Sequence, residues 1–427
     1  MSASGAPRVH VLANGVTVIC DPAPGFETLA LSVVAGRGAR WEDEARSGWS
    51  HLLEHMVFKG AGGRSAREIV EAIEADGGQL NAATGHERTS FQVRALRGGL
   101  SLAMEITADL IQRPALAADD LVREKQVVGQ EIAEAADTPD DQVFELVQGA
   151  AFPGQALGRP ILGSMDSLAP AEPASLEAWR AALYAPDRLV VSVSGAVDED
   201  EVLRLAERHF GGAPRGPAAA ESVAPARFEG GVAIERRRLE QAHLVFLLPA
   251  PGLRDPDHWT LRLFAEILGG GMSSRLFQEA RERLGLAYAV DAYADVYADV
   301  GVLGVYAGCA AGDAGQLAEV AAKEILGLAA AVRPGELARA KAQLKASLFM
   351  GRESLAARAE QAAGQRLAFG RLLEPAELAG AIDAVTAESL ARLGGRLLAP
   401  GRVAVSALGP KAAMGAPARF AAALAHG

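Results

Sequence analysis

Two stretches of this 427-residue chain carry a common pattern about half a chain length apart. Residues 185–195 read APDRLVVSVSG and residues 399–409 read APGRVAVSALG, an offset of 214 residues. A segment that we expect to be helical precedes each copy, at 175–183 and at 389–397. An internal repeat is what duplication of a structural unit leaves in a sequence. We therefore expect two similar α+β halves, with chance similarity in an alanine-rich chain as the alternative.

Chain length agrees with this division. A chain of 427 residues is too long for one hydrophobic core. Residues 211–231 are rich in Gly, Pro and Ala and show no periodicity, which is typical of a linker. We expect an N-terminal domain at 1–212, a linker at 213–231 and a C-terminal domain at 232–427.

Local patterns predict alternating strands and helices in the first half. Val9–Asp21 alternates around Asn14-Gly15, a strong hairpin signal. Further strands are expected at 28–34, 89–96 and 188–194, and helices at 43–59, 65–75, 98–112, 117–136, 174–183 and 199–210.

The expected helix 43–59 carries the motif His51-x-x-Glu54-His55. On a helix the two histidines lie one turn apart on the same face, a spacing that suits a zinc ion. Glu54 lies beside the second histidine and can act on a water molecule without binding the metal. This is the inverzincin signature, the reverse of His-Glu-x-x-His. The alternative is a pair of histidines packed at a helix–sheet interface, each bonded to a backbone carbonyl.

A third ligand is sought in the acidic helix expected at 117–136. Glu124, Glu131 and Glu134 lie roughly on one face of it. A catalytic zinc takes three protein ligands, so one of these carboxylates could complete the set with the two histidines. The alternative is a solvated helix face, although Val128 and Ile132 indicate that one flank is packed.

Three segments together resemble the pitrilysin/insulinase family of zinc metallopeptidases. They are GWSHLLEHMVFKG at 48–60, Gly77-Gly78-x-x-Asn81-Ala82-x-Thr84, and EKQVVGQEI at 124–132. The resemblance covers nearly the whole chain and is greatest to the short bacterial members that resemble mitochondrial processing peptidase subunits. It implies an α+β fold of two homologous domains, each a mostly antiparallel sheet with helices packed on one face.

The resemblance also implies roles for the motif residues. One Zn²⁺ per chain would be held by His51, His55 and Glu131, because the family's third ligand lies far downstream of the second histidine. Glu54 would be the general base. Glu124, one heptad before the third ligand, would support the site without contacting the metal.

The second half lacks the histidine motif, and its His243 and His258 are isolated. Gly269-Gly270-Gly271 does not continue into a phosphate-binding loop, since no lysine follows at the required spacing. The resemblance implies that Arg281 and Tyr288 reach the zinc site and hold the substrate or its oxyanion. From the residues alone, the alternative is a surface ion pair and a tyrosine in a sheet.

Substrate binding is expected at an edge strand near 79–84. The four residues assigned to it are Asn81, Ala82, Ala83 and Thr84. An extended peptide would add to this edge through main-chain hydrogen bonds. The expected function is a zinc-dependent endopeptidase that hydrolyses peptides or unfolded segments in an enclosed chamber. The alternatives are a non-proteolytic core subunit of a larger assembly and a presequence-type processing peptidase.

Charge and cysteine content restrict partners and location. The net charge of −11 argues against nucleic acid as a partner. Cys20 and Cys309 lie in opposite halves and are expected to be free thiols. With no apolar signal segment and no run long enough to span a bilayer, we expect a cytoplasmic protein with no membrane contact. We expect a homodimer in which the arginine–tyrosine pair of one subunit completes the site of the other; a heterodimer with a related subunit is possible.

Overall fold

The computed structural model describes residues 6–215 and 223–426. Their contacts divide them into two compact units. The first unit comprises the described residues of Met1–Ile132, Pro160–Val223 and Met350–Leu372. The second unit comprises those of Ala133–Arg159, Ala224–Phe349 and Leu373–Gly427.

The first unit is built on a six-stranded sheet in the order β1-β2-β8-β3-β7-β6. Its strands are β1 (Arg8–Val11), β2 (Thr17–Pro22), β3 (Thr28–Ala35), β6 (Gln79–Thr84), β7 (Thr89–Leu96) and β8 (Leu189–Gly195). All neighbours are antiparallel except β2 and β8. The expected hairpin is present as β1 and β2, and Gly15 adopts φ 101° at its turn, a conformation that favours glycine. A two-stranded ribbon, β4 (Gly60–Ala61) with β5 (Arg64–Ser65), stands apart.

Most helices of the first unit pack on one face of this sheet. They are α1 (Trp49–Val57), α2 (Ala66–Ala75), α3 (Leu100–Gln112), α4 (Ala118–Asp137, up to Ile132), α6 (Met165–Leu168), α7 (Pro173–Leu183) and α8 (Glu199–Phe210). Their apolar side chains form one core with the sheet, in which Leu52, Met56 and Phe91 are fully buried. Burial of such side chains is the main stabilising term for the unit.

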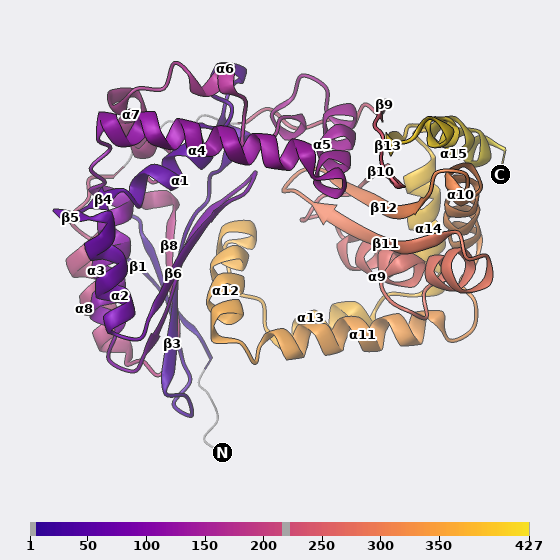
Figure 1. The fold of residues 1–427 in the computed structure, drawn as a ribbon. Coiled ribbons are helices and arrows are strands. Elements are labelled where there is room, and N and C mark those ends of the chain that lie inside the picture. The colour runs from indigo at the N-terminus through magenta and orange to yellow at the C-terminus, as the bar shows by residue number, and fades with distance from the viewer. Residues whose placement is uncertain (1–5, 216–222, 427) are drawn as a thin grey trace. The chain divides into compact units, whose positions relative to one another are not determined.

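Helix α12 (Leu355–Phe369) covers the other face, although it comes from the last fifth of the chain (Figure 1). Ala362 and Ala363 pack on Ile19, Val34 and Val190 of the sheet. A bidentate ion pair anchors the same helix, with the Arg358 guanidinium 2.6 and 2.7 Å from the two oxygens of Asp21. Both side chains of the pair are at least 90% buried.

Breaking this ion pair should destabilise the first unit. Arg358→Ala leaves the Asp21 carboxylate buried without its counter-charge, and such losses cost about 3–5 kcal/mol. Arg366→Ala is the matched control on the same helix, since Arg366 is partly exposed and donates a hydrogen bond to the carbonyl of Gly370. Urea unfolding should show a large loss for the first variant and little for the second. Equal losses would contradict a stabilising role for the pair.

The second unit is built on a five-stranded sheet in the order β11-β12-β10-β13-β9. Its strands are β9 (Gly231–Arg236), β10 (Gln241–Ala250), β11 (Ala287–Val296), β12 (Gly301–Ala310) and β13 (Ala404–Gly409). Its helices are α5 (Pro139–Ala151), α9 (His258–Gly269), α10 (Ala314–Ala330), α11 (Glu336–Gly351, up to Phe349), α13 (Pro375–Asp383), α14 (Ala387–Leu398) and α15 (Ala416–Ala425), with a π-helical segment at Phe277–Arg283. Helix α5 packs on the face opposite to the main helix layer, where Val143 and Val147 meet Val245 and Leu247.

The two sheets have the same topology once β1 is set aside. The order β2-β8-β3-β7-β6 corresponds to β9-β13-β10-β12-β11, with the single parallel pair at the same place. The repeated segments at 185–195 and 399–409 contain β8 and β13, which occupy equivalent positions. The predicted α+β fold of two homologous, mostly antiparallel domains is therefore confirmed. Each sheet carries in addition one helix on its second face.

The compact units differ from the contiguous domains expected at 1–212 and 232–427. Residues 133–159, which contain α5, belong to the second unit, and residues 350–372, which contain α12, belong to the first. Each sheet thus gains a second-face helix from the other half of the sequence. Of the expected linker 213–231, residues 216–222 lie outside the described residues.

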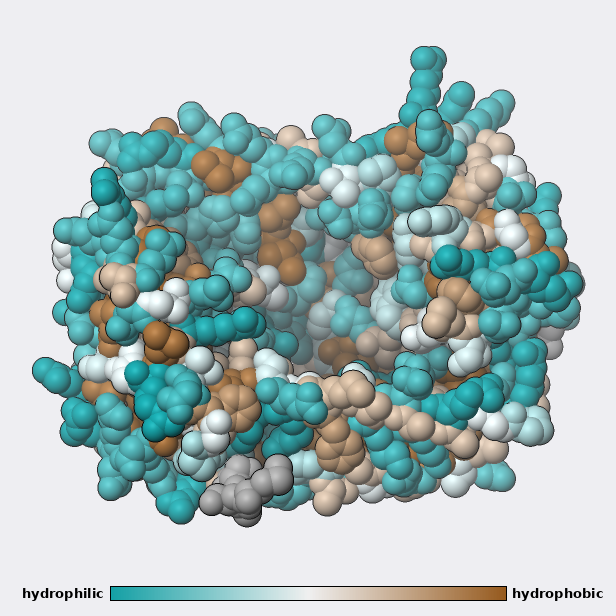
Figure 2. All heavy atoms as spheres, turned by 60° about the horizontal axis from the view of Figure 1, so that its bottom comes forward, coloured by the Kyte–Doolittle hydropathy of each residue, from teal (hydrophilic) through white to brown (hydrophobic). Residues whose placement is uncertain are grey.

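The surface and the cysteines add three facts. Hydrophilic side chains predominate on the face in Figure 2, and hydrophobic ones are scattered among them. In the described residues, Cys20 and Cys309 are free and buried, as expected. A helix with the length and apolar character needed to cross a membrane is not found in the described part of the chain.

Candidate metal centre

Helix α1 carries both histidines and begins later than the sequence predicts. Gly48 precedes it with φ 88°, and a Cβ there would come within 2.5 Å of the carbonyl oxygen of Leu162. This left-handed residue separates α1 from a short 3₁₀ turn at Glu44–Arg46, so the expected single helix over 43–59 is wrong at its start. The Glu42 carboxylate accepts hydrogen bonds from the backbone N–H groups of Gly48 and Ser50 at 2.8 and 2.7 Å. It thereby caps the helix N-terminus, a role that the sequence did not reveal.

The buried face of α1 fixes the direction of its polar face. Leu52, Leu53, Met56 and Val57 are fully buried in the core of the first unit. At helical spacing, this leaves His51, Glu54 and His55 on the remaining side, where they are only partly buried. Helix α4 brings Glu131 to the same place.

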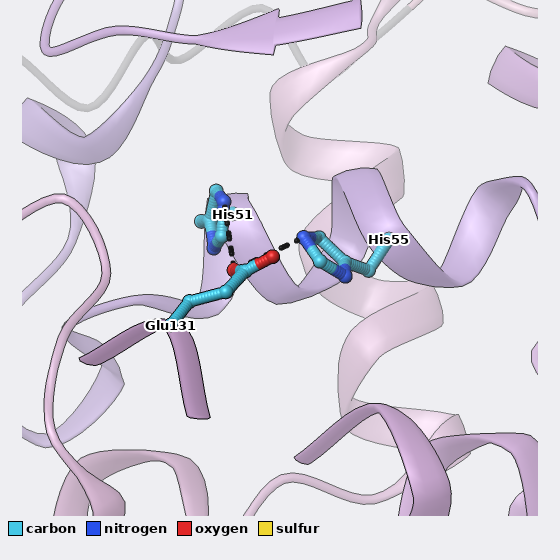
Figure 3. A group of neighbouring side chains, drawn as sticks. All are labelled: His51, His55 and Glu131. Atoms are coloured by element: carbon cyan, nitrogen blue, oxygen red, sulfur yellow. Dashed lines mark ion pairs between the residues drawn. The ribbon is translucent and has the colours of Figure 1, made fainter. Parts of the chain in front are cut away.

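The two imidazoles and the Glu131 carboxylate converge on one point (Figure 3). Glu131 Oε2 lies 3.8 Å from His51 Nε2 and 3.5 Å from His55 Nε2. Donor atoms about 2.1 Å from a tetrahedral zinc lie about 3.4 Å from one another. The spacing of these three residues therefore fits one zinc ion between them.

The hydrogen bonding of these residues also fits a metal. Within the described chain, Glu131 Oε2 is buried and has no hydrogen-bond partner. A buried carboxylate oxygen without a partner is costly unless a cation satisfies it. Burial, and then the neighbouring charge of His55, lowers the pKa of His51 to about 4, so His51 is neutral and offers a lone pair at neutral pH.

Glu124 stands behind the second histidine. One of its oxygens lies 3.1 Å from His55 Nδ1 and the other 2.9 Å from Lys59 Nζ. A carboxylate that accepts a hydrogen bond from the second ring nitrogen of a ligating histidine fixes the tautomer of that histidine. It also raises the basicity of the nitrogen that binds the metal. Glu124 is almost fully buried and does not belong to the metal-binding group. Glu134, the third acidic candidate, is exposed and also lies outside that group.

Glu54 lies next to the group without being part of it. Burial raises its pKa, while the hydrogen bond from Thr84 and the charge of His55 act in the opposite direction. A carboxylate with a raised pKa is a better proton acceptor, as a general base requires. The Thr84 hydroxyl donates to Glu54 Oε2 at 2.5 Å and holds this carboxylate in place.

The substrate-binding residues expected at 79–84 fall into two sets. Strand β6 is at the edge of the sheet, and Asn81 and Ala83 are exposed on it. Ala82 packs against the hydrophobic core, and Thr84 contacts Glu54. The contact between Thr84 and Glu54 was not predicted from the sequence, because it joins two elements that are distant in the sequence.

Removing the Thr84 hydroxyl should lower turnover without affecting metal binding. Thr84→Val keeps the shape of the side chain but loses a hydrogen bond to a carboxylate, which is worth about 1.5–3 kcal/mol. We expect kcat to fall about tenfold or more with zinc content unchanged. Thr84→Ser keeps the hydroxyl and should retain most of the activity. A Val variant as active as the Ser variant would show that this bond does not position the base.

Arg281 and Tyr288 lie in the second unit, whereas the three residues that could hold a metal ion lie in the first. The Arg281 guanidinium lies 5.8 Å from the ring centre of Tyr288 and 4.8 Å from that of Phe277. Tyr288 is 77% exposed. Their role at the zinc stays a prediction.

The two isolated histidines of the second unit show no ligand geometry. His243 Nδ1 lies 3.0 Å from the hydroxyl of Tyr306. His258 is buried at the start of α9, and its burial lowers its pKa to about 4. Neither belongs to the metal-binding group found in the described residues.

These residues define the centre of a reversed zincin, with two histidines from one helix and a glutamate from another. Comparisons with known proteins identify the family. Residues 17–165 match the family model described as "Insulinase (Peptidase family M16)", and residues 171–344 match "Peptidase M16 inactive domain". The chain belongs to the insulinase family, and the second match corresponds to the half that lacks the motif.

Its relatives span nearly its full length. It is 34% identical to an uncharacterized zinc protease of Rickettsia bellii over 91% of this chain and 94% of the relative. It is also 34% identical to one of Mycobacterium tuberculosis over 96% of this chain and 94% of the relative. A Bacillus subtilis relative of the same description is 34% identical over 88% of this chain and 91% of its own length.

Solved structures share the fold at lower identity. A protease from Helicobacter pylori superposes with a TM-score of 0.87 at 20% identity, covering 95% of this chain and all of the other. A chain of complex III2 from Candida albicans superposes with a TM-score of 0.82 at 21% identity, covering 94% and 95%. The fold is therefore shared by a chain described as a protease and by a chain of complex III2.

Proposed function

We propose that this chain is a zinc-dependent endopeptidase that hydrolyses peptides and unfolded polypeptide segments. The observation that carries the proposal is the convergence of His51, His55 and Glu131 around a buried carboxylate oxygen, with Glu54 beside them. The names of the relatives, zinc proteases of three bacteria, point to the same chemistry.

The residues of the site would have separate roles in hydrolysis. A zinc ion held by the two histidines and Glu131 would act as a Lewis acid, making water more acidic and a peptide carbonyl more electrophilic. Glu54 takes a proton from the attacking water and later gives it to the leaving amine. Thr84 keeps Glu54 oriented, and Glu124 keeps His55 in one tautomer.

The substrate would bind as an added strand. Strand β6 leaves one row of main-chain groups free at the sheet edge, and its end at Thr84 contacts the base Glu54. An extended peptide paired with this edge brings its backbone to the metal centre with little demand on sequence. Most strands of a folded protein are already paired within its own sheets, which favours peptides and unfolded segments. An enclosed chamber, as the family resemblance implies, would strengthen that selection.

The partner would be a second copy of this chain. Exposed Tyr288 and the adjacent Arg281 are donors that could serve the site of another subunit. One alternative is that the partner is a related chain and not a second copy. Another is that the protein is a processing peptidase that cuts each substrate once. A purely structural subunit is disfavoured, because it has no use for a buried unpaired carboxylate oxygen at two histidines.

Metal removal tests the proposal. The full chain is stripped with a chelator and assayed on one disulfide-bonded protein in its native form and in its reduced, alkylated form. We expect no cleavage of either by the stripped chain, and restoration by zinc of cleavage of the unfolded form only. Cleavage that persists without metal, or that does not distinguish the two forms, would contradict the proposal.

A further inference from the structure

The first unit contains a cavity at the end of its sheet farthest from Thr84. Its volume is about 320 Å³. It lies between the first turn of α12 and the ends of β3, β7 and β6. The lining residues that matter are Phe26, Gln79, Arg94, Leu96, Glu353 and Leu355. All of them belong to the first unit.

Both apolar and polar side chains line the cavity, and the large apolar ones lie on its helix side and at its rim. Leu355 forms its wall on the helix side and packs on the sheet with only 8% exposure. Phe26 and Leu96 also line it but stay 38% and 53% exposed. Large side chains left open at the rim of a cavity are typical of binding sites. Arg94 and Glu353 contribute one charge of each sign, so the lining favours an uncharged ligand group.

The cavity is continuous with the edge strand β6. Gln79, the first residue of β6, lines the cavity, and Thr84, the last, bonds the base Glu54. Thr84 follows Gln79 by five residue positions, about 17 Å of extended chain at about 3.3 Å per residue. A peptide on this edge would therefore meet the metal centre at one end and the cavity at the other.

The pleat of the sheet sets which peptide side chains face the cavity. Leu80 and Ala82 pack on the helix-side core, so Gln79 and Asn81 face the side of α12. Directly opposed residues of paired strands place their side chains on the same face. The peptide residue opposite Gln79 thus directs its side chain toward the cavity.

We propose that this cavity is a distal substrate subsite for a large apolar side chain, about five residues C-terminal to the scissile bond. The C-terminal side follows from antiparallel pairing with β6, the more stable arrangement, since β6 runs from the cavity toward the metal centre. The inference rests on the proposed peptidase function and deepens it. It defines the substrates as peptides that extend at least five residues beyond the cut with an apolar residue there.

The test uses the zinc-loaded full chain and a series of quenched peptides with one cleavable bond. Phenylalanine replaces serine at each of positions three to seven after that bond in turn. We expect kcat/KM to rise about tenfold or more for phenylalanine at position five or an adjacent position, and at no other. A flat profile, or a preference on the N-terminal side of the bond, would overturn the proposal.

Three variants test whether the preference for phenylalanine arises in the cavity. Leu96→Asp places a charge in the cavity, and Ala356→Phe fills it; in both variants the ratio of kcat/KM for the phenylalanine peptide to that for the all-serine peptide should fall to about one. Val70→Asp is the matched control, because Val70 is a 48% exposed apolar residue on α2 outside the cavity. A preference that survives both cavity variants would refute the subsite.

Measurements of peptide binding test the subsite independently of the proposed peptidase activity. Fluorescence anisotropy of labelled serine and phenylalanine peptides measures binding without hydrolysis. Tighter binding of the phenylalanine peptide by the native chain, lost in Leu96→Asp, would support the subsite even if no peptide were cleaved. Equal binding of the two peptides by the native chain would overturn it even if both were cleaved.

Discussion

Glu54→Gln is expected to abolish peptide hydrolysis while zinc stays bound. The amide cannot accept the proton that the carboxylate takes, but its oxygen can still accept the hydrogen bond from Thr84. Loss of a general base typically lowers rates about 10²–10⁴-fold. Because Glu54 lies outside the group that would hold the metal, zinc content should not change.

The measurement pairs metal analysis with single-turnover cleavage of one peptide. Glu74→Gln on α2 is the control, since Glu74 is exposed and distant in sequence from the motif. It should match the native chain in both readouts. A Glu54→Gln variant that cleaves at the native rate would assign the base elsewhere, and one that loses zinc would make Glu54 a ligand.

Glu131→Gln is expected to have the second large effect, this time on metal affinity. The carboxylate lies within 4 Å of both His51 Nε2 and His55 Nε2, and a neutral amide oxygen is a weaker zinc ligand. Replacing outer partners of a ligand costs about 10–100-fold in affinity, and loss of a ligand should cost more. Hydrolysis at limiting zinc should fall in parallel.

The three acidic residues of α4 provide an internal ranking. Zinc affinity, measured by competition with a chelator, should fall most for Glu131→Gln, less for Glu124→Gln and not at all for Glu134→Gln. Equal affinities for the first and last variants would show that the acidic face of α4 does not contribute a ligand.

The local parts of the fold and site were predictable from the sequence. Hairpin β1–β2 follows from Asn14-Gly15, and the spacing of His51 and His55 alone places two imidazoles on one helix face. The duplication, too, could be read from the repeat at 185–195 and 399–409, because β8 and β13 are central strands of similar composition.

The long-range parts were not predictable from local pattern. Helix α12 meets the sheet through small residues such as Ala359, Ala362 and Ala363, which in an alanine-rich chain do not mark a buried face. The start of α1 depends on Gly48 and on capping by Glu42, which no periodicity encodes. These features depend on tertiary contacts, which override local propensity.

The same distinction holds within the site. Choosing Glu131 over Glu134 needed the family resemblance, because 76 residues separate it from His55 and spacing alone left three carboxylates open. The bond between Thr84 and Glu54 joins β6 to α1 and has no signal in either segment. The structure shows supporting contacts, such as this hydrogen bond, that a sequence motif does not contain.

The central claim is tested most directly by measuring zinc stoichiometry and peptide cleavage together on the purified full chain. Mass spectrometry under native conditions gives the zinc content, and a quenched peptide library gives the cleavage sites. The proposed function predicts one zinc per chain and cuts at internal bonds of extended peptides. Bound zinc with no cleavage of any library member, or cleavage by a chain that holds no zinc, would contradict it.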